Sequence, residues 1–344
     1  MRKNFYPIFF ITFIFFFFSS FSVAEKLIIE PDAGRAPLLA AIKNAKSSID
    51  IVMYGFTDEA FINALVAAKN HGKNVNVLLE PQPYKAENEN NKTIRQLHAE
   101  NIQLQWPDPS FKLTHQKTLI FDQQSAIVMT FNLTHASFNR ERNFALILTE
   151  PNEVQEIKQV FDADWTHQNI TVTHPNLLWS PNNSREKILR FIQSARSEIK
   201  IYAQDVTDYQ TIGALANAAR TGVNVKILLS ASAEKWQSRK FSFLKKSGVM
   251  IHRSRHYYIH AKVMMIDHQR AILGSINLTK PSLDDNRELS VITQDADVIK
   301  QLNDTFDHDW GTSPRAKKNS SWPTMRMLHQ ISRLYYHAHR AMSF

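Results

Sequence analysis

HQKTLIFD at residues 115–122 and HAKVMMID at residues 260–267 follow one pattern: a histidine, a lysine two residues later and an aspartate seven residues later. An asparagine, Asn132 or Asn277, then follows ten residues after each aspartate. A single match to such a short pattern is weak evidence. Two matches at equivalent places, each with the same asparagine, indicate that the chain contains the same unit twice.

The repeat extends well beyond these segments. At a shift of 145 residues, Trp165 also matches Trp310. At a shift of 150 residues, IKNAKSSIDIVMYGFTDE (42–59) aligns with IQSARSEIKIYAQDVTDY (192–209). The second copy has therefore lost five residues between the two blocks. Self-similarity on this scale predicts two copies of one structural unit.

Each copy shows the same succession of helix and strand patterns. Gly72 and Gly222 are expected to end one helix in each copy. The predicted helices are 37–45, 154–165, 186–195 and 297–310, and the predicted strands are 49–53, 75–79, 118–121, 126–129, 144–148, 199–203, 225–229, 263–266, 271–273 and 289–293. Alternating strands and helices predict an α/β fold made of two tandem sandwich repeats. We expect a pseudo-two-fold relation between them, with an active site at their interface.

The repeated motif carries groups that suit phosphodiester cleavage. Residues two apart on a strand share a face, so each copy presents one imidazole and one ammonium to the same space. Two lysines supply positive charge for a phosphate, one neutral imidazole can attack phosphorus, and the other can protonate the leaving oxygen. The hydroxyls of Thr130 and Ser275 and the amides of Asn132 and Asn277 are candidate phosphate ligands.

From about Lys26 to Trp310, the chain resembles the phospholipase D superfamily and its paired HKD motifs. The resemblance implies an active site between two α/β sandwiches, a covalent phosphohistidine and no metal or other cofactor. It makes His115 the expected nucleophile and His260 the expected general acid. It also assigns the phosphate to Lys117, Lys262, Asn132 and Asn277, whereas Asp122 and Asp267 complete the motifs in structural or supporting roles.

One departure from the family pattern concerns the acidic residue that follows the asparagine. Glu288 occupies this place in the second copy and, by the resemblance, reaches across to His115. Its counterpart in the first copy is Asn143, while Glu141 lies two residues earlier and corresponds to Asn286. On an extended strand Glu141 and Asn143 share a face, so that Glu141 can substitute. Otherwise His260 has a neutral partner and a lower basicity.

The two ends of the chain lie outside the repeats. Residues 1–24 combine Arg2 and Lys3, a phenylalanine-rich run and a small-residue site, which predicts a cleaved signal peptide and a periplasmic or secreted protein. We assign residues 25–170 and 171–312 to the two repeats. Residues 313–344 form a basic tail with the spacing of an amphipathic helix. The chain has no cysteine, and its net charge of +9 favours anionic partners such as a membrane surface or nucleic acid.

These observations leave the phosphodiester open. The first expectation is hydrolysis of phospholipid headgroups to phosphatidic acid at a membrane surface, by a secreted phospholipase D-like protein. The absence of paired transmembrane helices argues against a cardiolipin synthase, and both motifs in one chain predict a monomer with an internal pseudo-dimer. The alternatives are a secreted, non-specific nuclease and a non-catalytic binder of anionic membranes. Nearby aromatic residues suit a lipid or bases: Trp106, Phe111, Phe131, Tyr257 and Tyr258.

Overall fold

The computed structural model describes residues 25–231 and 234–313. The predicted signal peptide (1–24) and all but the first residue of the predicted basic tail (313–344) lie outside the described residues. Within the described part, no helix is both long enough and apolar enough to cross a bilayer.

The first half is built on a mixed sheet in the order β1-β7-β6-β5-β2-β3-β4. Strands β2, β3 and β4 run parallel to one another, and the remaining neighbours in this order are antiparallel. Its elements are β1 (Lys26–Glu30), α1 (Ala36–Asn44), β2 (Ser48–Met53), α2 (Glu59–Asn70), β3 (Asn74–Leu79), α3 (Asn91–Ala99), β4 (Gln103–Gln105), β5 (Thr118–Phe121), β6 (Ser125–Met129), the short 3-10 helix η1 (Ala136–Phe138), β7 (Glu141–Leu148) and α4 (Pro151–Trp165).

The second half repeats this plan with its sheet in the order β11-β10-β9-β13-β14-β15-β8. Its elements are β8 (Leu177–Ser180), α5 (Ser184–Gln193), β9 (Glu198–Ala203), α6 (Tyr209–Arg220), β10 (Asn224–Ser230), α7 (Glu234–Lys246), β11 (Met250–Ser254), β12 (Tyr258–Ile259), β13 (Val263–Ile266), β14 (Arg270–Gly274), α8 (Lys280–Asp284), β15 (Glu288–Thr293) and α9 (Ala296–Gly311). Strand β12 leaves its own half and pairs with β7 of the first sheet.

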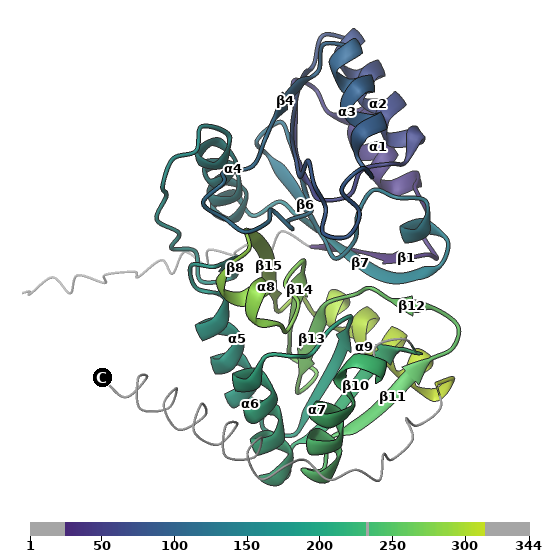
Figure 1. Ribbon diagram of the computed structural model, residues 1–344, viewed down its shortest axis with the longest axis vertical. Coiled ribbons are helices and arrows are strands. Elements are labelled where there is room, and N and C mark those ends of the chain that lie inside the picture. The colour runs from purple at the N-terminus through teal and green to yellow at the C-terminus, as the bar shows by residue number, and fades with distance from the viewer. Residues whose placement is uncertain (1–24, 232–233, 314–344) are drawn as a thin grey trace, which may run out of the picture.

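Three apolar cores hold the layers together. Each sheet packs its outer face against the helices of its own half, which gives one core per half. The third core lies between the halves and combines residues of both sheets with residues of α4 and α9. In Figure 1 the first half lies above the second, with β7 and β14 near the boundary. Because burial of apolar area is the main stabilising term, the shared core makes the two halves one structural unit.

The structure confirms the predicted α/β fold and its two-fold repetition. Gly72 and Gly222 follow α2 and α6 with φ angles of 82° and 99°, the left-handed conformation expected after a helix. At the start of these helices, Asp58 and Asp208 accept hydrogen bonds from backbone N–H groups and pair with Arg35 and Arg185. Several elements were not predicted, among them β1, β8, α3 and α7.

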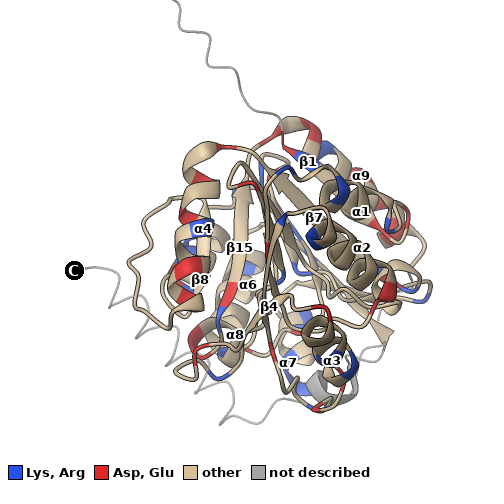
Figure 2. Cartoon of the chain, turned by 90° about the horizontal axis from the view of Figure 1, so that it is seen from above, with Lys and Arg blue, Asp and Glu red and all other residues tan. Residues whose placement is uncertain are grey.

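The charge of the described residues is almost balanced. Of the 41 lysines and arginines, two precede the described residues and six follow them, so that 33 remain against 32 acidic residues. Figure 2 shows both signs interspersed along the outer helices, for example on α4. The net positive charge of the chain therefore resides mainly in its two ends.

Candidate active site

The two motif histidines lie just before equivalent strands, His115 ahead of β5 and His260 ahead of β13. In each half the lysine two residues later turns back to the histidine's own carbonyl oxygen. Lys262 Nζ lies 2.6 Å from the carbonyl oxygen of His260, and Lys117 makes the same contact with His115. Both lysines are buried. The predicted pairing of one imidazole with one ammonium on one face is thus present in both copies.

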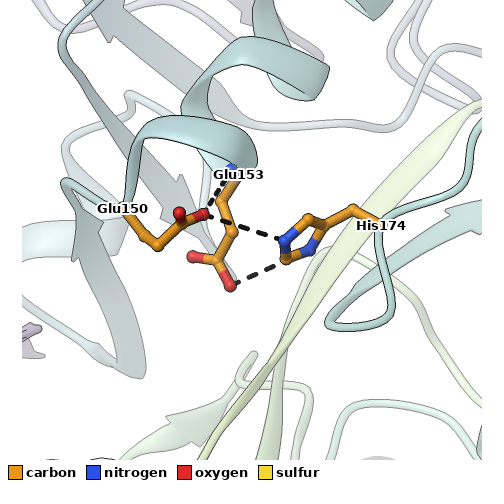
Figure 3. A group of neighbouring side chains, drawn as sticks. All are labelled: Glu150, Glu153 and His174. Atoms are coloured by element: carbon orange, nitrogen blue, oxygen red, sulfur yellow. Dashed lines mark hydrogen bonds and ion pairs between the residues drawn. The ribbon is translucent and has the colours of Figure 1, made fainter. Parts of the chain in front are cut away.

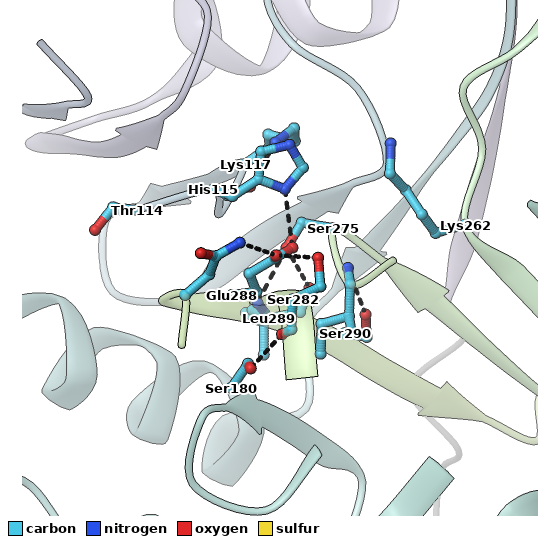
Figure 4. A network of polar contacts seen from close by, with 12 residues as sticks. Thr114, His115, Lys117, Ser180, Lys262, Ser275, Ser282, Glu288, Leu289 and Ser290 are labelled. Carbon is cyan, nitrogen blue, oxygen red and sulfur yellow. Dashed lines mark hydrogen bonds and ion pairs between the residues drawn. The ribbon is translucent and has the colours of Figure 1, made fainter. Parts of the chain in front are cut away.

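Glu288 contacts His115 across the boundary between the halves. Its Oε2 lies 2.9 Å from Nδ1 of His115, and Figure 4 shows the carboxylate directly beneath the imidazole. Ser282 Oγ and Asn286 Nδ2 donate to the other oxygen at 2.6 and 3.1 Å. Because an ionised carboxylate only accepts, Nδ1 carries the proton and Nε2 keeps its lone pair. The predicted contact is present, and it leaves His115 in the tautomer that a nucleophile needs.

His260 has a neutral partner instead. Asn143 Oδ1 lies 3.2 Å from Nδ1 of His260, and Asn143 Nδ2 donates to Glu141 at 2.9 Å. Glu141 itself stays 3.8 Å from the imidazole. Glu141 and Asn143 therefore share a face of β7, as expected for extended chain. Glu141 is therefore not the hydrogen-bond partner of His260. It accepts from the amide nitrogen of Asn143 and so keeps the amide oxygen of Asn143 directed toward His260.

Burial governs the protonation of these groups. It lowers the pKa of His115 to about 4, aided by Lys117 and opposed by Glu288. Burial, Lys262, Lys117 and His115 hold the pKa of His260 well below its usual value. Burial also lowers the pKa of Lys262 to about 7, and that of Lys117 well below its ordinary value. Contacts across the boundary bring groups of both halves together, since Glu288 bonds His115, Asn143 lies beside His260 and Lys262 Nζ donates to the carbonyl oxygen of Thr130 at 3.3 Å. With their pKa values lowered, both imidazoles are neutral at pH 7 without substrate.

Four candidate residues have structural roles in this arrangement. Thr130 Oγ1 donates to Asn143 and accepts from the N–H of Phe144, and Ser275 Oγ bonds the backbone of Leu289. Asp122 and Asp267 accept from the backbone N–H groups of residues 46–48 and 196–198. Groups of the protein already bond both hydroxyls, and phosphate binding by Thr130 and Ser275 stays a prediction. The two aspartates anchor turns, as expected.

The asparagines of the motifs differ from each other. Asn132 Oδ1 accepts from the N–H of Gly55 at 3.3 Å. Asn277 is only 9% exposed, and no group of the described residues bonds its Oδ1. The two asparagines remain predicted substrate ligands, although only Asn277 has an unused buried acceptor.

Two buried ion pairs that were not predicted from the sequence join the half-sites. Arg287 forms a buried bidentate pair with Asp164, with distances of 2.8 and 2.9 Å. Arg142 pairs with Asp309 in the same way, at 2.8 and 3.3 Å. Each pair joins one copy to the other, and the shift of 145 residues relates Arg142 to Arg287 and Asp164 to Asp309. Extending the repeat comparison to these charged residues would have found them.

The backbone makes the same reciprocal exchange. The N–H of His115 donates to the carbonyl of Arg287 at 2.9 Å, and the N–H of Ala261 donates to the carbonyl of Arg142 at 3.1 Å. Phe111 and Tyr257 pack against the guanidinium groups of Arg287 and Arg142. These two aromatic rings therefore support the arginines, and Phe131 is wholly buried.

A possible metal group among the described residues is Glu150, Glu153 and His174, shown in Figure 3. Each carboxylate already has a structural partner. Glu150 caps α4, and Glu153 accepts from Asn176 at 3.0 Å. None of the three belongs to the paired motifs, so this group has no evident part in the candidate active site.

Comparisons with known proteins identify the family of the chain. The family model described as "Cardiolipin synthase, PLD-like domain" matches residues 38–165 and 188–310. Cardiolipin synthase B of Escherichia coli K12 is 26% identical over 287 residues, which cover 71% of this chain and 68% of that protein. Cardiolipin synthase 1 of Staphylococcus epidermidis is 30% identical over 126 residues, 35% of this chain and 26% of that protein.

Solved structures support the fold. Phosphatidylserine synthase of Haemophilus influenzae has a TM-score of 0.66 and 12% identity, with 92% of this chain and 94% of that chain covered. Polyphosphate kinase of Porphyromonas gingivalis has a TM-score of 0.68 and 17% identity, with 92% of this chain and 53% of that chain covered. The sequence relatives are named cardiolipin synthases, which corrects the expected likeness to secreted phospholipases D. The chain belongs to the phospholipase D superfamily, within the family described as cardiolipin synthase, PLD-like domain.

Proposed function

We propose that this protein cleaves the phosphodiester of a phospholipid through a covalent phosphohistidine and passes the phosphatidyl group to an oxygen acceptor. The observation that carries the proposal is the pair of half-sites. Each supplies one imidazole and one buried lysine, and Glu288 of one half bonds His115 of the other. Acceptance by water is the expected hydrolysis to phosphatidic acid. The relatives named cardiolipin synthase support transfer to an alcohol as a second outcome.

In the first step, Nε2 of His115 attacks phosphorus and forms a P–N bond. The negative phosphate of the bound substrate favours the protonated imidazole of His260. The bond between phosphorus and the headgroup oxygen breaks, and the leaving oxygen takes that proton from His260, which becomes neutral. Glu288 stabilises the positive charge that develops on the His115 imidazole, because its carboxylate lies 2.9 Å from Nδ1. Lys117 and Lys262 offset the charge on the phosphoryl oxygens.

In the second step the roles reverse. The acceptor hydroxyl gives its proton to His260 and its oxygen attacks phosphorus, which breaks the P–N bond and restores the neutral His115. His260 must release and regain a proton easily, and a neutral amide partner suits this task better than a carboxylate. The Asn143 contact therefore supports His260 as acid and base, and the Glu288 contact supports His115 as nucleophile.

Two observations favour a lipid over a nucleic acid. The described residues carry almost balanced charge, whereas binding a nucleic-acid backbone depends on an excess of cations. Tyr258 is 42% exposed, and its ring centroid lies 6.4 Å from that of His260. An amphipathic ring beside the reacting groups suits the interface between headgroups and acyl chains. Export to the periplasm or medium remains part of the proposal.

The test compares phosphatidylcholine vesicles with plasmid DNA, both in EDTA. We expect headgroup release from the vesicles, lost in His115→Ala and retained in His135→Ala, since His135 is exposed. Cleavage of DNA without cleavage of lipid would assign the alternative nuclease function. Activity that requires an added divalent metal would contradict the mechanism, and retention of activity in His115→Ala would remove the proposed nucleophile.

A further inference from the structure

Tyr54 contacts both motif side chains of the first half. It directly follows β2, and Val52 of this strand pairs with Thr118, the first residue of β5. The end of β2 therefore lies beside the segment that carries His115 and Lys117. The centroid of the Tyr54 ring is 4.6 Å from that of the His115 imidazole, and Nζ of Lys117 lies 5.0 Å from the Tyr54 ring centroid. No step of the proposed mechanism uses this ring.

The contact with His115 restricts a motion that Glu288 leaves free. Glu288 bonds a single atom of the imidazole, Nδ1, so the ring can still turn about that hydrogen bond. The planes of the Tyr54 and His115 rings lie at 70° in an edge contact, an arrangement that aromatic pairs prefer. An imidazole that is bonded at Nδ1 and packed against a second ring keeps Nε2 in one direction, as attack on phosphorus requires.

The contact with Lys117 favours the charged form of this lysine. Burial holds the pKa of Lys117 well below its ordinary value, and a neutral amine would not offset the charge of a phosphoryl oxygen. The face of an aromatic ring attracts an ammonium, more strongly where water is excluded. The Tyr54 ring therefore stabilises a charge that burial disfavours.

Tyr54 is itself held at both ends. Its hydroxyl oxygen accepts from the N–H of Tyr84 at 2.6 Å, and its carbonyl oxygen accepts from Nδ2 of Asn90 at 2.8 Å. Asn90 is wholly buried, and it also donates to the carbonyl oxygen of Glu80 and accepts from the N–H of Phe56. The position of the Tyr54 ring is thus fixed by groups outside the paired motifs.

The second half has no such ring at the equivalent place. The shift of 150 residues relates Tyr54 to Gln204, whose amide nitrogen lies 3.4 Å from the hydroxyl oxygen of Tyr258. The ring is therefore present in the half that holds the proposed nucleophile. We propose that Tyr54 is a positioning residue, whose ring fixes the orientation of His115 and stabilises the ammonium of Lys117. The inference rests on the proposed function, because it takes His115 as the nucleophile.

The test measures steady-state kinetics in EDTA with bis(p-nitrophenyl) phosphate as the donor. Tyr54→Leu removes the ring and should lower kcat about tenfold or more, because misplacement of a reacting group slows the chemical step. KM should stay within about twofold, since the ring acts on protein groups and not on the substrate. Tyr54→Phe keeps the ring and should retain kcat within about threefold, since it loses only the bond to the N–H of Tyr84. Circular dichroism and urea unfolding establish that each variant is folded in the assay.

Tyr209→Leu is the matched control. The Tyr209 ring on α6 also packs against a lysine, with Nζ of Lys240 at 4.5 Å from the ring centroid, but neither residue belongs to the candidate active site. The same substitution there should leave kcat unchanged. Tyr54→Gln copies the second half and provides another variant without the ring, which should show the same loss as Tyr54→Leu.

The proposal is overturned if a folded variant without the ring keeps the wild-type kcat. It is also overturned if KM alone rises, which would make Tyr54 a substrate ligand. A loss in Tyr54→Phe as large as that expected without the ring overturns it too, even where Tyr54→Leu and Tyr54→Gln do not fold.

Because the donor is not a lipid, the outcomes for the two proposals separate. The expected kinetic pattern without cleavage of phosphatidylcholine supports the role of Tyr54 and rejects the proposed lipid function, whereas lipid cleavage with an unchanged kcat in Tyr54→Leu does the reverse. Where the wild type cleaves only the lipid, the same variants are compared by headgroup release. A wild-type enzyme that cleaves neither donor overturns both proposals.

Discussion

Replacing Arg287 by methionine should destabilise the protein strongly and also slow its chemistry. The guanidinium holds both oxygens of Asp164, and the two side chains are only 3% and 7% exposed. Burial raises the pKa of Asp164 even with this partner present. Without the arginine, a buried carboxylate is left uncompensated, and breaking such a pair costs about 3–5 kcal/mol.

The chemical effect follows from the backbone. The carbonyl of Arg287 accepts from the N–H of His115 at 2.9 Å, and Glu288 is the next residue. A shift of about 1 Å at this point would misplace nucleophile and carboxylate together, which can cost about a hundredfold in turnover. The assays are urea unfolding and turnover of a phosphodiester below the unfolding transition.

Two further variants make this prediction specific. The double variant Arg287→Met, Asp164→Leu removes both charges and should recover most of the lost stability, because apolar replacement of a buried pair is often neutral. Lys300→Met breaks the exposed Lys300–Asp304 pair and should leave unfolding unchanged. The reasoning is refuted if Arg287→Met unfolds within about 1 kcal/mol of the wild type, far below the cost of a broken buried pair.

Three other predictions concern the site. His115→Ala should reduce turnover more than about a thousandfold, whereas His260→Ala should let the phosphoryl group remain on His115, detectable as added mass in an acid-free digest. The free-enzyme kcat/KM should rise through about pH 4, as His115 loses its proton, and fall through about pH 7, as Lys262 loses its charge; a flat profile from pH 5 to 9 would contradict this. Asp122→Asn should lower the free energy of unfolding by about 1 kcal/mol without changing turnover of the folded enzyme. Its carboxylate has a pKa of about 2, since backbone hydrogen bonds outweigh burial. This contribution is therefore present above the ordinary pKa and disappears as pH falls through about 2.

The fold was predictable from the sequence because most of the helix and strand patterns occur twice, once in each copy of the repeat. Strands β5 and β13 lie inside the repeated motif and are wholly buried, and all their residues but Thr118 are apolar. Strands β1 and β8 lacked such a marker, since each consists of only four or five residues and precedes the aligned blocks. Their partners, β7 and β15, are distant in sequence, so local pattern does not reveal the pairing.

The contacts of the histidines, lysines and Glu288 were predictable from the sequence. The contacts of the hydroxyl groups of Thr130 and Ser275 were less predictable. Glu288 bonds His115 as expected, and each lysine lies beside its own histidine. Thr130 and Ser275 follow the motif as phosphate ligands would, yet a hydroxyl bonds a backbone group as readily as a phosphate. Here those groups belong to Phe144 and Leu289, on the neighbouring strands. Which use prevails depends on strand register, and a single sequence does not specify that.

Glu141 and Asn143 in the first half correspond to Asn286 and Glu288 in the second, so the carboxylate and the amide exchange places. As a result His115 has a carboxylate partner and His260 has an amide partner. Both halves keep one carboxylate and one amide at these two places, and in both a serine donates to the carboxylate, Ser137 in one and Ser282 in the other. The exchange therefore preserves the charge and hydrogen bonding of each half while changing which group meets the imidazole. A carboxylate favours the cationic ring of a phosphohistidine, and an amide lets a ring give up its proton. In the proposed mechanism, moving one charge by two residues along the chain separates the nucleophile from the acid, while the ion pairs that join the two halves are kept.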